Sequence, residues 1–218
     1  MPGPSQTVSA LRSLLAARFP ERARRPCGGP PAGVRAIDDA LGGGLPAGRL
    51  TELVSAVPSS GGQTVVARLL AATRTARQRM ALIDGSDGFA PEALPAGDLC
   101  HLVWVRCRLP EQALAVADIL VRDGNYAVAV LDLRGCAERL LRRTPASVWY
   151  RLQRAAEGGS VAVLVQTQAP LVPAAPWRLS LAAPLPLSDA EAPREAVADR
   201  LAARAERSHS PVADLLAG

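Results

Sequence analysis

The sequence predicts an α/β fold in which a mostly parallel sheet is flanked by helices. Two observations support this prediction. Short apolar runs of strand length alternate with longer segments of helical periodicity from residue 33 onward, and this alternation is typical of strand–helix–strand units. Most of the apolar runs are continuous, as in strands that are buried on both faces. With 218 residues, of which 49% are hydrophobic, the chain can form one such core.

The expected elements follow one another in a regular order. Helices are expected at residues 62–77, 111–123 and 137–157, and Pro145 is a candidate break in the last one. A final strand at residues 177–182 is expected at the sheet edge. The strands that precede it are expected at residues 48–55, 80–84, 101–105, 126–133 and 160–167.

Residues 1–32 are expected to lie apart from this core. Thr7 can cap a short amphipathic helix whose apolar stripe includes Leu11 and Leu15. Residues 20–33 are rich in proline, glycine and arginine, which is typical of a mobile linker. The stripe either contacts a partner or packs on the protein's own core, and the sequence leaves both options open.

The region from residue 187 to residue 218 is predicted to be a charged, partly disordered tail that follows a core of residues 33–186. Residues 194–207 favour a short helix with a thin stripe formed by Val197 and Leu201. A stripe this thin does not fold alone, so these two side chains are candidate partner contacts. The alternative is a frayed chain end with no role.

Composition excludes several kinds of site. All 25 basic residues are arginines, so no lysine is present for a phosphate-binding loop, a Schiff base or a general base. The net charge of +5 permits weak attraction to nucleic acid only. Four cysteines without a CxxC pair, together with two histidines, predict free thiols and no metal site. The first residues lack the features of a signal peptide, so a cytoplasmic location is expected.

One segment carries a family resemblance. Residues 33–64, GVRAIDDALGGGLPAGRLTELVSAVPSSGGQT, resemble the entry to the ATPase core of RecA-type recombinases. The resemblance continues through IDGSDGFAP at 83–91, LPEQALAVADIL at 109–120 and AVAVLDL at 127–133. It covers most of residues 33–183 and implies a truncated RecA-like P-loop core, with a mostly parallel sheet flanked by helices.

The nucleotide loop departs from this family. A working P-loop needs glycines, a lysine for the outer phosphates and a hydroxyl for the metal ion. Here Ser55 replaces the first glycine, Pro58 looks inserted, and Gln63 or Gly62 stands where the lysine belongs. Weak or absent binding of ATP and magnesium is therefore expected. The degenerate loop consists of Ser59, Ser60, Gly61, Gly62, Gln63 and Thr64.

The resemblance assigns further positions by analogy. Ser86 occupies the place of the family's catalytic glutamate, with the carboxylate of Asp87 one position away. Asp132 matches the magnesium-linked aspartate, and a cap of the turn into the next helix is the alternative interpretation. Gln166 or Gln168 resembles the glutamine that couples nucleotide to DNA, and a plain polar strand end is the alternative. The absence of the loop lysine and of the catalytic glutamate implies a pseudo-ATPase without catalytic residues.

Contacts with DNA are expected to be weak or indirect. The segment after the strand at 160–167, TQAPLVPAAPW, is too short for the family's main DNA loop. A run of arginines on the helical region can follow phosphates or form a solvated face, and only Trp149 and Tyr150 are placed to stack on bases. These arginines are Arg139, Arg142, Arg143, Arg151 and Arg154.

The spacing ALGGGLPAGRLTEL, together with the degenerate loop, resembles the ImuA-like proteins of damage-inducible mutagenesis cassettes. This resemblance implies a non-catalytic adaptor in SOS-induced, error-prone translesion synthesis. Its implied partner is an ImuB-like inactive relative of Y-family polymerases, with RecA and a DnaE-type polymerase as further candidates. Two alternatives stay open: a DNA-dependent ATPase in which an arginine such as Arg49 or Arg68 replaces the lysine, and a DNA-binding protein that uses the arginine face.

Overall fold

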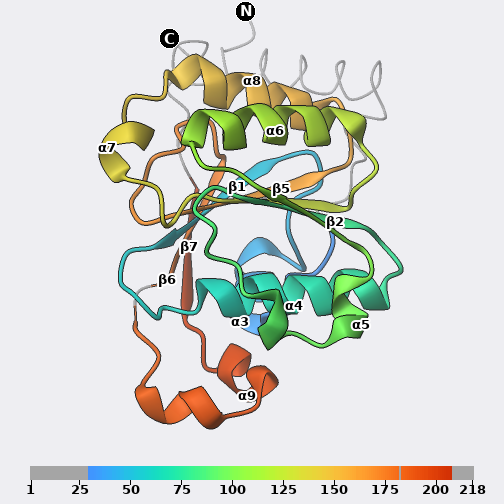
Figure 1. The fold of residues 1–218 in the computed structure, drawn as a ribbon, viewed down its shortest axis with the longest axis vertical. Helices are drawn as coiled ribbons and strands as arrows, with labels where there is room; N and C mark the ends of the chain where they lie inside the picture. The colour runs from blue at the N-terminus through green and yellow to red at the C-terminus, as the bar shows by residue number, and fades with distance from the viewer. Residues whose placement is uncertain (1–28, 182, 208–218) are drawn as a thin grey trace, which may run out of the picture.

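Helices cover both faces of a central sheet in the computed structural model, which describes residues 29–181 and 183–207. Helices α6 (Pro110–Asp123) and α8 (Ala146–Glu157) lie on one face, as Figure 1 shows above the sheet. Helices α3 (Arg35–Leu41), α4 (Gly62–Thr75) and α5 (Ala96–Leu99) lie on the other face. The predicted α/β class is confirmed. The expected N-terminal helix with Leu11 and Leu15 lies outside the described residues.

In the part of the chain that the structure describes, the sheet has seven strands in the order β3-β2-β4-β5-β1-β6-β7. All neighbouring strands run parallel except β6 and β7, which are antiparallel. Because β1 lies beside β5 and β5 beside β4, the segments that follow these three strands meet at one edge of the sheet. The strand bounds are β1 Leu50–Ser55, β2 Met80–Asp84, β3 Leu102–Arg106, β4 Val128–Asp132, β5 Ala162–Thr167, β6 Trp177–Leu181 and β7 Ala203–Arg207.

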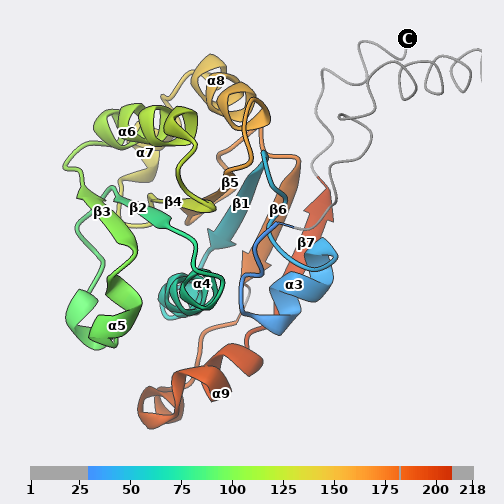
Figure 2. The ribbon, with the colours of Figure 1, turned by 90° about the vertical axis from the view of Figure 1, so that its right-hand side faces the viewer.

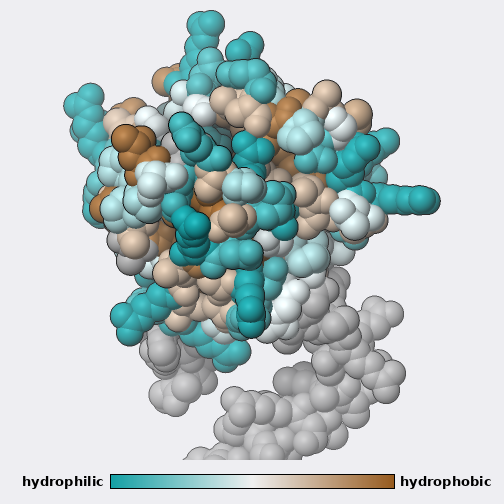
Figure 3. Space-filling model, turned by 90° about the horizontal axis from the view of Figure 1, so that it is seen from below, coloured by the Kyte–Doolittle hydropathy of each residue, from teal (hydrophilic) through white to brown (hydrophobic). Residues whose placement is uncertain are grey.

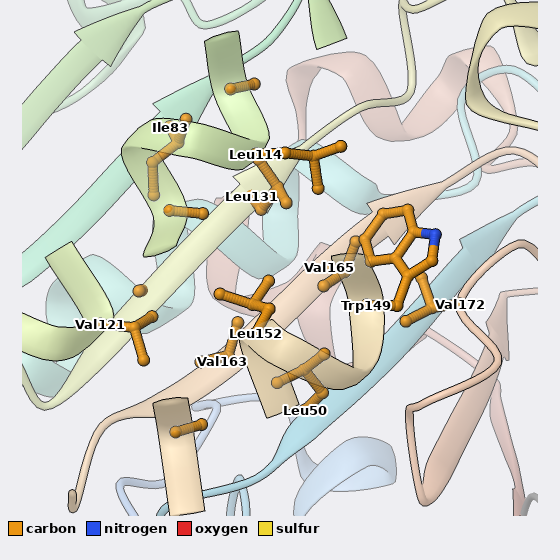
Figure 4. Close-up of a cluster of buried hydrophobic side chains, with 14 of the residues drawn as sticks. Leu50, Ile83, Leu114, Val121, Leu131, Trp149, Leu152, Val163, Val165 and Val172 are labelled. Carbon is orange, nitrogen blue, oxygen red and sulfur yellow. The ribbon is translucent and has the colours of Figure 1, made fainter. Parts of the chain in front are cut away.

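The four inner parallel strands fit the continuous apolar runs of the sequence. Every residue of β1, β2, β4 and β5 is buried, because helices cover both faces of the sheet there. On one face Trp149 and Leu152 of α8 pack against Val163 and Val165 of β5 (Figure 4). The second core lies on the opposite face, around Leu53 and the apolar side of α4.

The long helix expected at 137–157 is interrupted. It consists of α7 (Glu138–Leu141) and α8, and Pro145 is the residue that precedes α8. A proline fits that position because its missing N–H has no partner at a helix start. The candidate break is therefore confirmed. Three short elements in the first half of the chain were not expected: α3, α5 and the 3-10 helix η1 (Pro91–Ala93).

The predicted C-terminal tail is wrong for residues 187–207. This region contains the 3-10 helix η2 (Leu187–Glu191), α9 (Arg194–Asp199) and β7, and β7 pairs with β6 (Figure 2). The strand β6 is therefore an inner strand, and the expectation that it lies at the edge of the sheet is wrong. Pairing with β7 satisfies backbone groups of β6 that an edge strand leaves open. The guanidinium of Arg207 lies 4.7 Å from the centre of the Trp177 ring and adds a contact between the two strands.

Val197 and Leu201 belong to the core and are not free to contact a partner. Their exposed fractions are 8% and 5%, and the Leu201 side chain packs against Gly61 of the loop after β1. A thin apolar stripe does not fold alone, but here it adds to a core that the sheet has already formed. The two candidate partner contacts are thus corrected to structural residues.

The chain just before α3 is also held in place where the structure describes it. Ala32 is fully buried, and its N–H donates to the Asp38 carboxylate at 2.6 Å. The Gly33 N–H donates to the same carboxylate at 3.1 Å. Burial raises the pKa of Asp38, and the two N–H donors counteract part of this rise. The expected linker is therefore anchored at its end, residues 32 and 33.

The described helices are all too short or too polar to cross a lipid bilayer. Within the same residues, no cluster of histidine, cysteine, aspartate and glutamate has the composition of a metal site.

Candidate functional site

The candidate site is built on the loop between β1 and α4. Ser59 and Gly61 adopt left-handed backbone conformations, with φ angles of 59° and 95°. This path turns the chain sharply and places Gly61 at the N-cap of α4, a helix of 14 residues. The first N–H groups of such a helix lack partners within it and form a partly positive end. The backbone thus resembles a phosphate-binding loop in shape.

The side chains of this loop carry no charge. Ser60 is buried, Thr64 is half-buried, and Ser59 and Gln63 are exposed. The Gln63 amide donates to the Gly88 carbonyl at 3.0 Å, so this side chain is directed to the turn after β2. Gly62, the other position considered for the missing lysine, is the first residue of α4.

The space beside Gly62 is filled by Arg134, a residue that the sequence interpretation did not single out. A Cβ atom built on Gly62 would overlap Nη1 of Arg134 and lie 2.9 Å from its Cζ. Arg134 comes from the turn directly after β4, at the carboxyl edge of the sheet. The only sequence signal for it is its position two residues after the strand-ending Asp132.

Arg134 forms a bidentate ion pair with Asp132. Its Nε lies 2.9 Å from Oδ1 and its Nη2 lies 2.5 Å from Oδ2. The backbone N–H of Arg134 also donates to Oδ1, at 3.1 Å. Asp132 is only 3% exposed, so both of its oxygens are committed within the protein. The alternative interpretation of Asp132 as a cap of the following turn fits these contacts.

Gln166 completes the cluster from the neighbouring strand. It lies opposite Asp132 in the β4–β5 register and is fully buried. Its Nε2 donates to the Gly62 carbonyl at 3.3 Å, while its Oε1 has no hydrogen-bond partner among the described residues. The structure therefore brings together Gly62, Asp132 and Gln166, three of the sequence-predicted positions. Gln168, the other candidate, is exposed.

The turn after β2 brings no carboxylate to the loop. Asp84 accepts the backbone N–H groups of Ser86, Gly88 and Phe89 at 3.2, 3.1 and 3.0 Å. Asp87, the carboxylate next to the position of the expected glutamate, has a φ angle of 55° and pairs with Arg106 at 3.4 Å. Its charge is thus directed to Arg106 on β3.

The loop forms one wall of a cavity of about 950 Å³. The opposite wall is the C-terminal segment, whose Leu185 N–H donates to the Ser59 carbonyl at 2.9 Å. Seen from the end that carries α9, the surface shows hydrophobic residues in separate patches among hydrophilic ones (Figure 3). Charged and apolar side chains line the cavity together. They include Arg134, Asp189, Arg194, Val57 and Leu187.

The donor set of this loop does not fit a magnesium-bound nucleoside triphosphate. Such a ligand needs a cation at the lysine position and a carboxylate that is free to act on the metal side. Here neither candidate for the lysine position, Gly62 or Gln63, carries a charge. Arg134 holds both oxygens of Asp132, the carboxylate on the metal side. The disagreement lies in the side chains, because the backbone of the loop keeps its curved path.

The two arginines considered as substitutes for the lysine are engaged elsewhere. Arg49 precedes β1, at the opposite end of the strand from the loop, and forms an ion pair with Glu157. Arg68 donates to the Gly33 carbonyl and pairs with Glu195, both at 3.0 Å. Neither guanidinium reaches the loop.

The arginine face is partly neutralised by acids. Arg142 pairs with Glu138, and Arg151 lies 3.9 Å from Asp118. The remaining arginines are exposed and form no ion pair with any described residue; they are Arg139, Arg143 and Arg154.

The two aromatic residues of this face do not form a stacking platform. Trp149 is 1% exposed and belongs to the core under α8, so it is not available to bases. Tyr150 is half-buried. The alternative in which Trp149 stacks on bases is therefore excluded.

The fold and the site define a class: a P-loop-type α/β protein whose phosphate loop lacks its cation. Residues 20–137, more than half of the chain, match the RecA N-terminal domain, and the chain belongs to the RecA family. Structure and sequence agree on this assignment.

Relatives named "Protein RecA" resemble this chain over part of their length. The protein from Nocardia farcinica is 40% identical over 119 residues, covering 53% of this chain and 34% of the relative. That from Kineococcus radiotolerans is 35% identical over 147 residues, covering 61% and 42%. That from Mycobacterium tuberculosis H37Rv is 38% identical over 119 residues, covering 53% and 15%. The chain thus spans less than half the length of these relatives.

Proposed function

We propose that this protein is a non-catalytic RecA-like adaptor that acts through protein contacts in error-prone translesion DNA synthesis. The observation that carries the proposal is the Asp132–Arg134 ion pair beside Gly62. It commits the metal-side carboxylate and fills the space where a loop lysine would stand. A RecA fold that keeps its sheet but has neither a loop lysine nor a free metal-side carboxylate is suited to present surfaces and not to turn over ATP.

The resemblance to ImuA-like proteins supplies the biological setting of this proposal. The partner we propose is an ImuB-like inactive relative of Y-family polymerases, with RecA and a DnaE-type polymerase as further partners. The short segment between β5 and β6 supports an adaptor, because Glu52 fixes it to the sheet by accepting from the Leu171 and Val172 N–H groups at 2.6 and 3.1 Å. A segment held in this way does not extend to wrap DNA.

Two measurements test the proposal. The purified full chain is expected to show no ATP turnover, with or without single-stranded DNA, and no saturable binding of a fluorescent ATP analogue at low micromolar concentration. A tagged chain, recovered from cells treated with a DNA-damaging agent, is expected to retain the polymerase-related partner. Turnover that depends on DNA and disappears in Asp132→Ala would favour the ATPase alternative and contradict this proposal.

A second candidate function is DNA binding through the arginine face. It is favoured by one observation: the exposed side chains of Arg139, Arg143 and Arg154 have no acidic partner among the described residues. Free cations of this kind bind phosphates with an affinity that falls as salt rises. Titration of single-stranded DNA at several salt concentrations separates this function from the adaptor, which needs no DNA affinity of its own.

A further inference from the structure

We infer that Arg134 and Gly62 form a matched pair, in which the arginine takes the space of the loop lysine and closes the phosphate end of the site. The ion pair with Asp132 then holds the loop in one conformation without a ligand. This inference deepens the proposed non-catalytic function and rests on it. It concerns how the site was closed, whereas the proposed function concerns what the closed protein does.

Gly62 begins α4 with a φ angle outside the left-handed region, so its backbone accepts any side chain. The atoms nearest to a Cβ at this position are Nη1 and Cζ of Arg134, together with Oε1 of Gln166 at 3.0 Å. A side chain at position 62 and Arg134 in its present place therefore exclude each other.

The Arg134 side chain is 18% exposed and the Asp132 side chain 4%, so solvent screens this pair only weakly. The guanidinium and the carboxylate neutralise each other through two hydrogen bonds. One contact thus removes both the free cation that phosphates need and the free carboxylate that acts on the metal side.

The Asp132 carbonyl accepts the Gly85 N–H at 2.9 Å, which ties the ion pair to the turn after β2. The Gln166 carbonyl accepts the Leu133 N–H at 2.9 Å, which ties it to β5. Gln166 in turn donates to the Gly62 carbonyl at the start of α4. Four elements therefore meet around this pair: β4, β5, α4 and the turn after β2.

A double-mutant cycle on the full chain tests the inference. The variants are Gly62→Lys, Arg134→Ala and the two together, and thermal melting is the readout. Removing the arginine leaves a buried carboxylate unpaired, and we expect a fall in Tm of about 6–12 °C. Gly62→Lys alone is expected to lower Tm because it displaces Arg134. The double variant is expected to lose less than the sum, since Gly62→Lys alone already displaces Arg134, so both single variants disrupt the same ion pair.

A matched control shows that the effect belongs to this position. Gly158 has a φ angle of −71° at the exposed end of α8, and a Cβ there meets only ordinary contacts. Gly158→Lys alone is expected to change Tm little, and combined with Arg134→Ala it is expected to add little to the fall that Arg134→Ala causes. Additive Tm effects of Gly62→Lys and Arg134→Ala would overturn the matched pair.

Nucleotide binding is the second readout. The double variant is expected to bind a fluorescent ATP analogue with magnesium at least about tenfold more tightly than the natural chain, the gain of one charged hydrogen bond to phosphate. Gly62→Lys alone is expected to show no gain. If the Tm effects of Gly62→Lys and Arg134→Ala are not additive but the double variant gains no nucleotide binding, the inference that Arg134 closes the site is wrong.

The outcomes separate this inference from the proposed function. If the natural chain binds no nucleotide and the Tm effects are additive, the matched pair fails and the non-catalytic function stands. If the natural chain binds the analogue and Arg134→Ala weakens this binding, the arginine serves the ligand, and both the closure and the non-catalytic function fail.

Discussion

Glu52 and Arg178 lie opposite each other in register on β1 and β6, and the Arg178 Nε donates to the Glu52 carboxylate at 2.7 Å. The carboxylate is fully buried and also accepts the Thr167 hydroxyl at 3.1 Å. The N–H groups of Leu171 and Val172 complete its shell. One buried acid thus joins three adjacent strands to the short segment that follows β5.

We expect Glu52→Gln to destabilise the protein. The amide replaces one accepting oxygen with an N–H donor, which then faces the donors of Arg178 or of the backbone. The free energy of unfolding is expected to fall by about 2–4 kcal/mol, because the partly buried Arg178 guanidinium loses the negative charge with which it pairs. Urea unfolding followed by circular dichroism measures this fall.

The control for this prediction is an exposed ion pair. Glu138 pairs with Arg142 on the surface, where both side chains are largely solvated. Glu138→Gln is expected to cost less than about 1 kcal/mol. Equal effects of the two substitutions would show that the buried carboxylate contributes no more than a surface one.

The C-terminal segment is expected to be essential for stability. Leu201 is 5% exposed and packs on Gly61, so Leu201→Ala leaves a cavity beside the loop. The expected loss in the free energy of unfolding is about 2–4 kcal/mol. Leu187, which is 91% exposed in the same segment, provides the control. Leu187→Ala is expected to stay within about 0.5 kcal/mol of the natural chain.

A truncation at Pro193 sharpens this prediction. It removes α9 and β7 and exposes the backbone groups of β6 that β7 satisfies. We expect the truncated chain to lose its cooperative melting transition or to aggregate. A truncated chain that melts at the natural temperature would mean that residues 194–207 are dispensable for the fold.

Sequence patterns predicted the inner sheet well and its C-terminal edge poorly. The strands at Leu50–Ser55 and Ala162–Thr167 are continuous apolar runs, and burial on both faces produces that pattern directly. The strand at Ala203–Arg207, ARAER, consists of residues that favour helices, and only its pairing with β6 makes it a strand. Tertiary pairing thus overrode local propensity at this edge.

The same division holds for the site. The positions of Gly62, Asp132 and Gln166 were among those assigned by the resemblance to RecA-type recombinases. They lie together because parallel strands bring their carboxyl ends to one edge. Arg134 and Glu52 were missed. Their roles depend on side-chain directions and on contacts between distant segments, and a linear pattern records neither.

DNA binding by the arginine face, the second candidate function, makes a selective prediction. Arg139, Arg143 and Arg154, which form no ion pair with the described residues, are expected to contact phosphates, whereas Arg142 is already paired with Glu138. Replacing these three arginines with alanine is expected to reduce the salt dependence of single-stranded DNA binding by about two in log–log slope. Arg142→Ala is expected to change this slope less than any one of the other substitutions. Fluorescence anisotropy at a series of salt concentrations measures these slopes, and equal slopes for the natural and triple-substituted chains would exclude this face as the DNA contact.

The cysteines are expected to differ in reactivity according to their surroundings. Cys100 is exposed, whereas Cys136 is half-buried beside the ion pair and donates its S–H to the Gly85 carbonyl at 3.2 Å. Burial, followed by the nearby carboxylate of Asp132, raises the pKa of Cys136 to about 11. At pH 8 only about one Cys136 thiol in a thousand is then ionised, and the thiolate is the reactive form.

Alkylation with iodoacetamide at pH 8, followed by peptide mass spectrometry, tests this difference. The peptide with Cys100 is expected to be labelled first, and the peptide with Cys136 much more slowly. Labelling in urea serves as the control, because unfolding removes the burial that raises the pKa of Cys136 and its rate should then rise toward that of Cys100. In Arg134→Ala the unpaired charge of Asp132 is expected to slow Cys136 further wherever the fold persists, since a nearby anion disfavours the thiolate. Equal labelling rates for the two cysteines in the folded protein would contradict the packing of Cys136 against Gly85, and with it the closed arrangement around Asp132.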